Sequence, residues 1–303
     1  MHQRLYAGIE AGGTKFVCVV ARGVDEILEE VRIPTTIPEE TLGAVVRFFI
    51  DARTRHGPIS SFGIGTFGPV DLRRGSATWG QLLETPKAAW SGADLVRPLM
   101  AAFSCPIQID TDVNAAALAE LLYGAGRGCH SLTYITVGTG IGGGTVIDGQ
   151  TLHGMLHPEM GHIRVKRDPR DMAFPGTCPF HRDCLEGLAS GPAILARWGV
   201  PLDQMGEGHV AFEIVGNYLG QLAATIALIL SSERIVFGGG VMQCSALFPP
   251  LRRAAEAMLN GYLPTHGADW ADRYIVPPAL ADRSGRVGAI YLAMSGIQER
   301  IAR

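Results

Sequence analysis

A strand, a glycine turn and a second strand occur twice in the chain, and this repeat limits the possible folds more than any other feature. The first copy is YAGIEAGGTKFVCVV at residues 6–20, and the second is YITVGTGIGGGTVID at residues 134–148. In both copies β-branched and aromatic residues flank a run of glycines, which predicts two strands joined by a tight turn. Two copies in a chain of 303 residues favour two halves of related architecture.

The first glycine run is similar to a phosphate-binding loop, but it does not match a Walker A motif. Four residues separate Gly8 from Gly13 as that motif requires, yet Thr14 stands before Lys15, and residues 16–20 predict a strand where a P-loop opens a helix. Successive backbone amides in a turn can form an anion site without a helix. The hairpin is therefore predicted to bind phosphate, with Thr14 and Lys15 offering a hydroxyl group and a charge.

Two further glycine runs, at residues 138–144 and 238–240, follow the predicted strands 132–137 and 234–237. Residues 138–143 and 63–68 both match the spacing of a dinucleotide-binding motif. Neither opens a helix with an acidic residue at the required distance, so a dinucleotide site is not expected. For each run alone, hairpin geometry is a sufficient explanation. Three glycine turns that each follow a strand favour a ligand.

Predicted helices alternate with strands along the rest of the chain, which indicates an α/β fold with ligand in a cleft between its halves. We expect helices at residues 38–53, 93–103, 115–126 and 211–230, and further strands at residues 61–65, 106–110 and 145–148.

Asp112 is the candidate catalytic residue. It lies just after the predicted strand 106–110 and just before a helix, so its carboxylate could cap that helix. Alternatively, a carboxylate at the carboxyl end of a strand could accept the proton of a substrate hydroxyl that attacks a phosphorus atom. Asp110 is the rival, but strand alternation turns it to the opposite face.

A cysteine and histidine cluster predicts a zinc site. Cys178, His181 and Cys184 have the spacing C-x₂-H-x₂-C, and His162 is the expected fourth ligand, with His157 in reserve. Two thiolates and two imidazoles suit a closed tetrahedral zinc site of structural type, which leaves no position for a reactive water. The alternative is free thiols in a loop. The polar segment 165–177 shows little means of holding its own shape, so a metal would order it.

The composition limits the kinds of binding partner that the chain is expected to have. The formal charge of −3 and the pI near 6.3 leave no basic excess for nucleic acid, so a small polar ligand is expected. The N-terminus has no apolar run of signal-peptide length, and the apolar segment 222–230 is too short to span a bilayer. We therefore expect a soluble cytoplasmic protein with reduced cysteines and no membrane partner.

Taken together, the motifs resemble the ROK family of sugar kinases over nearly the whole chain. They are GIEAGGTK, GTFGPVD, DTDVNAAALAE, VGTGIGGG, HPEMGH with CPFHRDCLEG, and FGGGV. The TPKAAW segment and the form of the zinc loop are most similar to the bacterial fructokinase branch. This resemblance implies a duplicated actin-like/hexokinase (ribonuclease H-like) ATPase fold with two domains and an interdomain cleft. The expected domains are residues 1–116 with 288–303, and residues 117–287 with the zinc loop.

The resemblance also implies roles for individual residues. The first phosphate loop is Gly12, Gly13, Thr14 and Lys15, the second is Gly138, Thr139 and Gly140, and the adenosine side is Gly239 and Gly240. Asp112 is the general base. The sugar-binding positions are Thr111, Glu159, Glu186 and His162, of which His162 is alternatively a zinc ligand with Cys178, His181 and Cys184. Lys87 and Trp90 could contact the sugar or brace a loop.

The implied activity is an ATP-dependent hexose kinase that forms fructose 6-phosphate from D-fructose, with ATP, Mg²⁺ and structural zinc, in a homodimer. The family's glucokinases have Asn-Asp where this chain has Thr111-Asp112, which favours fructose over glucose. A broad hexose or mannose kinase and an N-acetylhexosamine kinase are alternatives. Two non-enzymatic alternatives are a sugar-binding protein and a sugar-responsive repressor. A repressor of this family would carry a helix-turn-helix domain before the first phosphate loop, whereas only seven residues precede Gly8 here.

Overall fold

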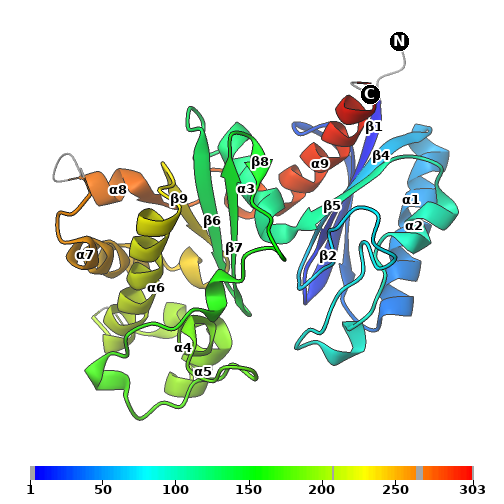
Figure 1. The fold of residues 1–303 in the computed structure, drawn as a ribbon. Helices are drawn as coiled ribbons and strands as arrows, with labels where there is room; N and C mark the ends of the chain where they lie inside the picture. Colours follow the sequence, from blue (N-terminus) through cyan, green and yellow to red (C-terminus); the bar gives the residue numbers. More distant parts are fainter. Residues whose placement is uncertain (1–3, 207, 264–268, 302–303) are drawn as a thin grey trace. The chain divides into compact units, whose positions relative to one another are not determined.

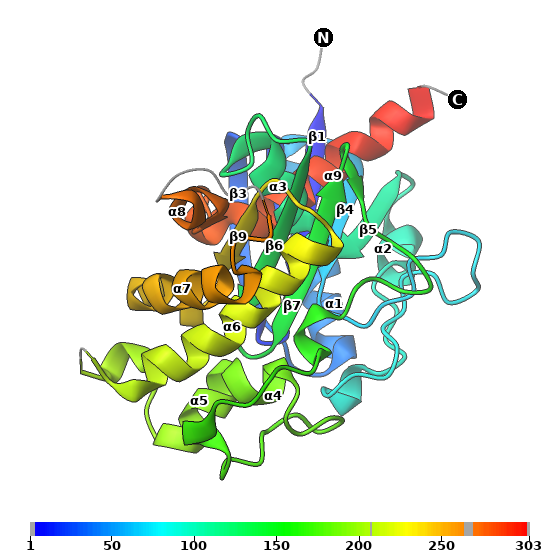
Figure 2. The same cartoon turned by 60° about the vertical axis from the view of Figure 1, so that its left-hand side comes forward.

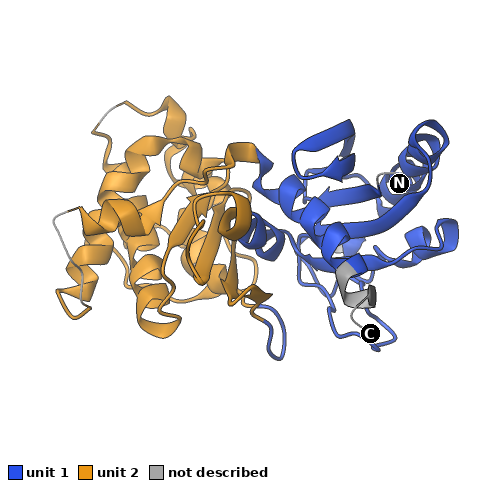
Figure 3. Ribbon diagram, turned by 90° about the horizontal axis from the view of Figure 1, so that it is seen from above, with its two compact units in different colours: residues 1–119, 153–157, 283–303 blue, residues 120–152, 158–282 orange. Residues whose placement is uncertain are grey.

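The computed structural model describes residues 4–206, 208–263 and 269–301, and the chain divides into two compact units (Figure 3). Unit 1 contains residues 1–119, 153–157 and 283–303, and unit 2 contains residues 120–152 and 158–282. The chain passes from one unit to the other within helix α3 (Asp112–Tyr123). The domain limits expected at residues 116 and 287 stay a prediction.

Unit 1 is built on a five-stranded sheet with the order β3-β2-β1-β4-β5. The strands are β1 (Leu5–Ala11), β2 (Lys15–Gly23), β3 (Glu26–Pro34), β4 (Ile59–Thr66) and β5 (Ile107–Thr111). The first three strands are antiparallel neighbours, whereas β4 and β5 run parallel to β1. The predicted hairpin at residues 6–20 is therefore confirmed.

Helices cover both faces of this sheet (Figure 1). Because side chains alternate along β2, Phe16 packs on the face of α1 (Pro38–His56) and α2 (Arg97–Ala102), while Val17 packs against α9 (Ser284–Ile301). The approach of α9 is close: a Cβ atom on Gly63 of β4 would lie 2.0 Å from the Ala289 carbonyl oxygen.

Unit 2 repeats the topology of unit 1. Its five-stranded sheet has the order β10-β9-β6-β7-β8, in which β6, β7 and β8 are antiparallel neighbours and β9 and β10 run parallel to β6. The strands are β6 (Ser131–Val137), β7 (Ile141–Ile147), β8 (Gln150–Thr151), β9 (Ile235–Gly238) and β10 (Ile275–Val276). The duplication predicted from the glycine repeat is thus present in strand order and direction.

The helices of unit 2 gather around its longest helix, α6 (Val210–Ile229), which packs beside α7 (Phe248–Leu259) (Figure 2). Gly220 makes room for this contact, because a Cβ atom there would lie 2.6 Å from the Leu251 carbonyl oxygen. Among the described residues α6 alone has the length and hydropathy to cross a membrane, but 67% of that window is buried inside the structure. Its apolar sequence therefore reflects a place in a protein core.

The remaining helices are short. They are α4 (Leu185–Ala189), α5 (Gly191–Trp198) and α8 (Trp270–Tyr274), with 3₁₀ turns at Ala88–Trp90, Met160–His162, Pro169–Asp171, Leu202–Gln204, Val241–Gln243, Ser245–Leu247 and Ala281–Arg283.

Four element predictions were wrong in their limits by three or four residues. The helix expected at residues 115–126 is α3 at Asp112–Tyr123, and the helix expected at residues 38–53 extends to His56. The helix expected at residues 93–103 begins only at Arg97, because the Leu82 N–H donates to the Ala93 carbonyl oxygen and the Leu95 N–H to the Gly80 carbonyl oxygen. The strand expected at residues 145–148 begins at Ile141, since its glycines pair with β6 instead of forming a loop.

Candidate active site

The first glycine turn joins β1 to β2 in unit 1. The Gly12 N–H donates to the Lys15 carbonyl oxygen at 3.0 Å and closes the hairpin. Gly13, Thr14 and Lys15 are exposed, so the turn is accessible to a ligand. The four predicted phosphate-loop residues therefore lie together in one turn, and their role stays a prediction.

Asp112 lies at the carboxyl end of β5, as expected, but it is not the helix cap. The Thr111 hydroxyl oxygen accepts a hydrogen bond from the Asn114 N–H at 3.1 Å, the usual bond of an N-cap residue, and α3 begins at Asp112. The Asp112 carboxylate accepts from the next amide, that of Val113, at 2.8 Å. Capping is thus carried out by Thr111, which the sequence analysis had placed only at a sugar position.

Asp110 is buried and committed to structure. One of its carboxylate oxygens accepts from the Asn114 side-chain amide at 2.7 Å, and the other lies 3.1 Å from Nε2 of His153. The hydrogen bond that the His153 ring donates to the Asp110 carboxylate raises the pKa of His153. Asp112 is only half-buried, which makes it the better candidate for contact with a substrate.

The second and third glycine turns follow β6 and β9, which are parallel neighbours in unit 2. The Gly138 N–H donates to the Gly140 carbonyl oxygen at 2.8 Å and closes a turn that also holds Thr139. Gly239 has φ of +91°, and a Cβ atom there would lie 2.4 Å from the Val137 carbonyl oxygen. Only glycine fits this position, because it must turn sharply against the end of β6. Both turns, including Gly240, therefore lie at one end of the sheet.

A pocket of about 480 Å³ lies beside the third turn. Its wall mixes apolar and polar groups; it includes Gly191, Ile194, Leu202, Asp203, Val241 and Gln243. No sequence motif marks this pocket, because its lining comes from two segments about forty residues apart. The volume is of the size that small-molecule sites have.

Two predicted sugar-binding carboxylates lie close enough in unit 2 to influence each other. Glu186 is in α4, and its carboxylate accepts from the Ile141 N–H at 2.9 Å, directly after the second glycine turn. Desolvation, together with repulsion from Glu186, raises the pKa of Glu159 to about 7. Near neutral pH this pair can therefore hold a proton, so that one carboxyl group donates to a hydroxyl while the other accepts.

The predicted metal ligands come together. The ligand atoms of His162, Cys178, His181 and Cys184 all lie within 4.8 Å of one another. Sulfur to nitrogen distances are 3.8 Å from Cys178 to His162, 3.7 Å from Cys178 to His181 and 3.6 Å from Cys184 to His162. A tetrahedral centre with zinc–sulfur and zinc–nitrogen bonds of about 2.3 and 2.0–2.1 Å separates the two atom types by about 3.6 Å. The residues present therefore fit zinc.

The cluster lies next in sequence to both carboxylates that are predicted to bind sugar. Cys184 is the residue before α4, which carries Glu186, and His162 ends the 3₁₀ turn that follows Glu159. The reserve ligand His157 does not belong to the cluster. It is a buried residue of unit 1 whose Nε2 accepts from the Val70 N–H at 3.2 Å.

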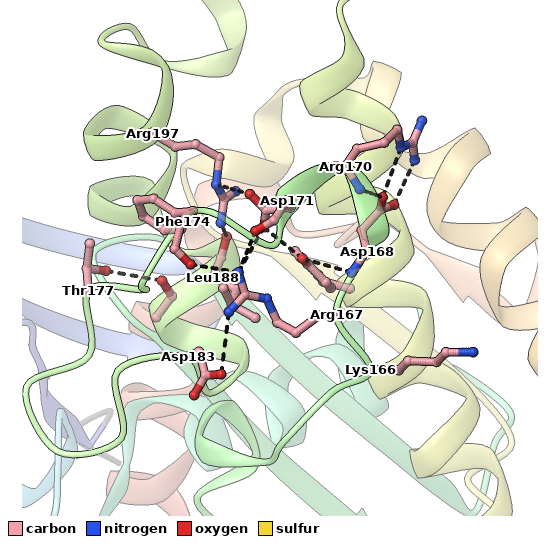
Figure 4. A network of polar contacts seen from close by, with 12 residues as sticks. Lys166, Arg167, Asp168, Arg170, Asp171, Phe174, Thr177, Asp183, Leu188 and Arg197 are labelled. Atoms are coloured by element: carbon pink, nitrogen blue, oxygen red, sulfur yellow. Dashed lines mark hydrogen bonds and ion pairs between the residues drawn. The ribbon is translucent and has the colours of Figure 1, made fainter.

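The segment 165–177 was expected to have little means of holding its own shape, and this was wrong. Figure 4 shows a polar network through it. Asp171 is 4% exposed, pairs with Arg197 at 2.9 Å and accepts from the Tyr218 hydroxyl at 2.7 Å. Arg167 donates to the carbonyl oxygen of Phe174 at 2.6 Å. Tyr218 and Arg197 are far from the segment in sequence, so its composition could not reveal these partners.

Comparison with known proteins identifies the family. Residues 6–295 match the ROK family. The chain belongs to this family. A fructokinase from Zymomonas mobilis is 47% identical over 296 residues, which cover 97% of this chain and 97% of that protein.

Solved ROK structures have the same fold. A ROK hexokinase from Thermus thermophilus has a TM-score of 0.77 and 27% identity, covering 97% of this chain and 99% of that one. A ROK glucokinase from Streptomyces griseus, solved with glucose and AMPPNP, has a TM-score of 0.70 and 25% identity, with 96% and 99% covered. The predicted α/β fold of actin-like/hexokinase type is confirmed.

Proposed function

We propose that this ROK protein is an ATP-dependent fructokinase, which transfers the γ-phosphate of ATP to the primary hydroxyl group of D-fructose and releases fructose 6-phosphate and ADP. The observation that carries the proposal is the 47% identity to a fructokinase across 97% of both chains. The likeness to glucokinases is lower, at 25–30% identity. Both likenesses support phosphate transfer to a sugar, and their difference supports fructose.

Asp112 is proposed as the general base. Its half-buried carboxylate begins α3 at the carboxyl end of β5, the end of an α/β sheet at which ligands commonly bind. There it would accept the proton of the attacking hydroxyl, a contribution of about 10²–10⁴ in rate. Asp110 is unsuited to this role, since Asn114 and His153 already hold its carboxylate.

The glycine turns are proposed to hold ATP. The turn at residues 12–15 and the turn at residues 138–140 present backbone amides to phosphates, and the pocket beside Gly239 and Gly240 would take the nucleoside. Mg²⁺, when bound with ATP, would neutralise charge on the transferring phosphate.

The zinc cluster is proposed to keep Glu159 and Glu186, the two proposed sugar-binding carboxylates, in fixed positions. His162, Cys178, His181 and Cys184 would ligate the ion, which would supply rigidity and no reactive water because all four positions are protein atoms. The ion would thereby fix Glu159 and Glu186 for hydroxyl groups of the sugar, with Thr111 of unit 1 as a further contact. The family resemblance also supports a homodimer and a cytoplasmic location.

The test is ADP release measured with fructose, mannose, glucose and N-acetylated hexoses, for the wild type, Asp112→Asn and the matched control Asp25→Asn. Asp25 is exposed in the turn between β2 and β3, so its substitution makes the same chemical change at a distance from the site. We expect preference for fructose, a loss of about 10² or more in kcat for Asp112→Asn, and an unchanged control. Preference for another sugar would refute the fructokinase assignment, and near-normal turnover of Asp112→Asn would refute the base.

A further inference from the structure

The segment Thr85–Trp90 is anchored beside the first glycine turn. Trp90 is fully buried, and its indole N–H donates to the Thr36 carbonyl oxygen at 2.7 Å. Its ring lies 5.4 Å from that of Phe16, the residue that follows Lys15 in β2. Phe16 lies in β2, which flanks the turn, and Thr36 lies two residues after β3, the neighbour of β2, so the segment is fixed with respect to the turn.

Lys87 extends from this segment to the backbone of the turn. Its ammonium group donates to the Gly13 carbonyl oxygen at 2.6 Å and to the Thr35 carbonyl oxygen at 3.2 Å. Thr35 completes the arrangement: its hydroxyl donates to the Gly12 carbonyl oxygen at 2.8 Å, and its N–H donates to the Thr14 carbonyl oxygen at 3.0 Å. Three consecutive carbonyl groups of the turn are therefore held by Thr35 and Lys87.

Fixing the carbonyl groups also fixes the amides. The C=O and N–H groups of a trans peptide point in opposite directions, so the Gly13 N–H points away from the Thr35 hydroxyl that holds the Gly12 carbonyl, and the Thr14 N–H points away from the Lys87 ammonium group that holds the Gly13 carbonyl. In the described part of the chain neither of these amides donates a hydrogen bond. Two successive amides presented in this way form the start of an anion site.

We propose that Lys87 is a positioning residue for the phosphates of ATP: it holds the Gly13 carbonyl group and thereby presents the Thr14 amide, and it holds the carbonyl group of Thr35, whose hydroxyl in turn holds the Gly12 carbonyl and thereby presents the Gly13 amide. This inference rests on the proposed function, because it takes the turn to be a phosphate loop. Lysine suits the position, since a compact ammonium group with three donors can bridge two carbonyls, whereas the planar fork of arginine matches carboxylates and phosphates. The chain has three lysines, Lys15, Lys87 and Lys166, among its 26 basic residues.

The first experiment compares Lys87→Ala with the wild type and with Lys166→Ala, which removes an exposed lysine of unit 2. We expect Lys87→Ala to raise the KM for ATP about tenfold or more, with the KM for fructose within twofold and a smaller loss in kcat. The control should match the wild type. A rise in the fructose KM would show that Lys87 contacts the sugar, and a loss in kcat of about 10³ at unchanged ATP KM would show direct contact with the transferring phosphate. Either result would overturn the proposal.

A second variant tests the same contacts independently, in case Lys87→Ala does not fold. Thr35→Val removes the hydroxyl bond to Gly12 and keeps the backbone contacts of Thr35, so it should raise the ATP KM in the same direction and leave the fructose KM unchanged. If it leaves both constants unchanged, the clamp does not control the amides and the proposal fails.

Binding of AMPPNP separates this proposal from the proposed function. If the wild type binds AMPPNP but phosphorylates no sugar, only the proposed function fails, and Lys87→Ala must still weaken AMPPNP binding about tenfold. If the wild type is an active fructokinase and Lys87→Ala binds AMPPNP as tightly as the wild type, only the clamp fails. The three lysines also permit ¹⁵N NMR of the ammonium groups, in which Lys87 alone should show slow exchange with water.

Discussion

At the scale of single residues, Thr111 caps a helix in the structure, and under the proposed function it also contacts the sugar. Its hydroxyl oxygen caps α3 by accepting from the Asn114 N–H, and the residue is 3% exposed. Its single O–H donor is therefore the only side-chain donor it could offer to a sugar. Asparagine would cap the helix equally well and would add an amide with two donors.

We therefore predict that Thr111→Asn shifts preference towards glucose without loss of stability. One additional hydrogen bond favours glucose by about 1 kcal/mol, so the ratio of kcat/KM for glucose to that for fructose should rise about fivefold to tenfold. Steady-state kinetics with both sugars measure this ratio. Thr111→Ser keeps the hydroxyl group and should leave the ratio unchanged. If Thr111→Asn also leaves it unchanged, hexose preference is decided elsewhere.

At the scale of elements, two separate groups of side chains support the segment 159–186, which carries Glu159 and Glu186 and is called the wall below. Under the proposed function a zinc ion bound by the four candidate ligands holds its two ends, while the buried contacts of Asp171 with Arg197 and Tyr218 hold the segment between them. Breaking a buried ion pair by removing one partner costs about 3–5 kcal/mol, so the network is a substantial support by itself. Loss of the metal should consequently loosen the wall without unfolding unit 2.

We predict that the purified protein contains one zinc ion per chain, and that Cys178→Ser with Cys184→Ser removes it. The double variant should stay folded by circular dichroism, lose melting temperature, and show a fructose KM raised about tenfold or more at a nearly constant ATP KM. Cys129→Ser, a cysteine of unit 2 outside the cluster, is the matched control. Metal content by mass spectrometry of the elements and steady-state kinetics provide the measurements. A zinc-free wild type with full activity would contradict the prediction.

Local signals accounted for much of these elements, and contacts between distant segments accounted for the rest. Both hairpins, the long helix α6 and the cysteine–histidine cluster follow from periodicity and spacing within short stretches. The sequence could not show that α2 begins at Arg97 and not at residue 93, because residues 93–95 pair with residues 80–82 through backbone hydrogen bonds. The partners of Asp171 and the reach of Lys87 to Gly13 are likewise absent from any motif, since each joins segments dozens of residues apart.

At the scale of the whole molecule, segments from opposite ends of the sequence pack together in unit 1. Helix α9 starts at Ser284, yet it packs on β1 and β4, which lie within the first 66 residues. The backbones approach so closely that a Cβ atom on Gly63 would lie 2.0 Å from the Ala289 carbonyl oxygen and 2.4 Å from the Ala293 nitrogen. Unit 1 can therefore be completed only when its last segment has been synthesised.

We predict that Gly63→Ala forces α9 away from the sheet and destabilises unit 1 by about 1–3 kcal/mol or more, because neither backbone can yield to the added methyl group. Hydrogen exchange measured by mass spectrometry should show lost protection in β1, β2 and β4 and retained protection in β6 and β9, since unit 2 has a separate core. Gly23→Ala is the control, as a Cβ atom at the end of β2 meets nothing within 4 Å. Equal loss of protection in both units would mean that they unfold together, and a stable Gly63→Ala would mean that α9 can shift without cost.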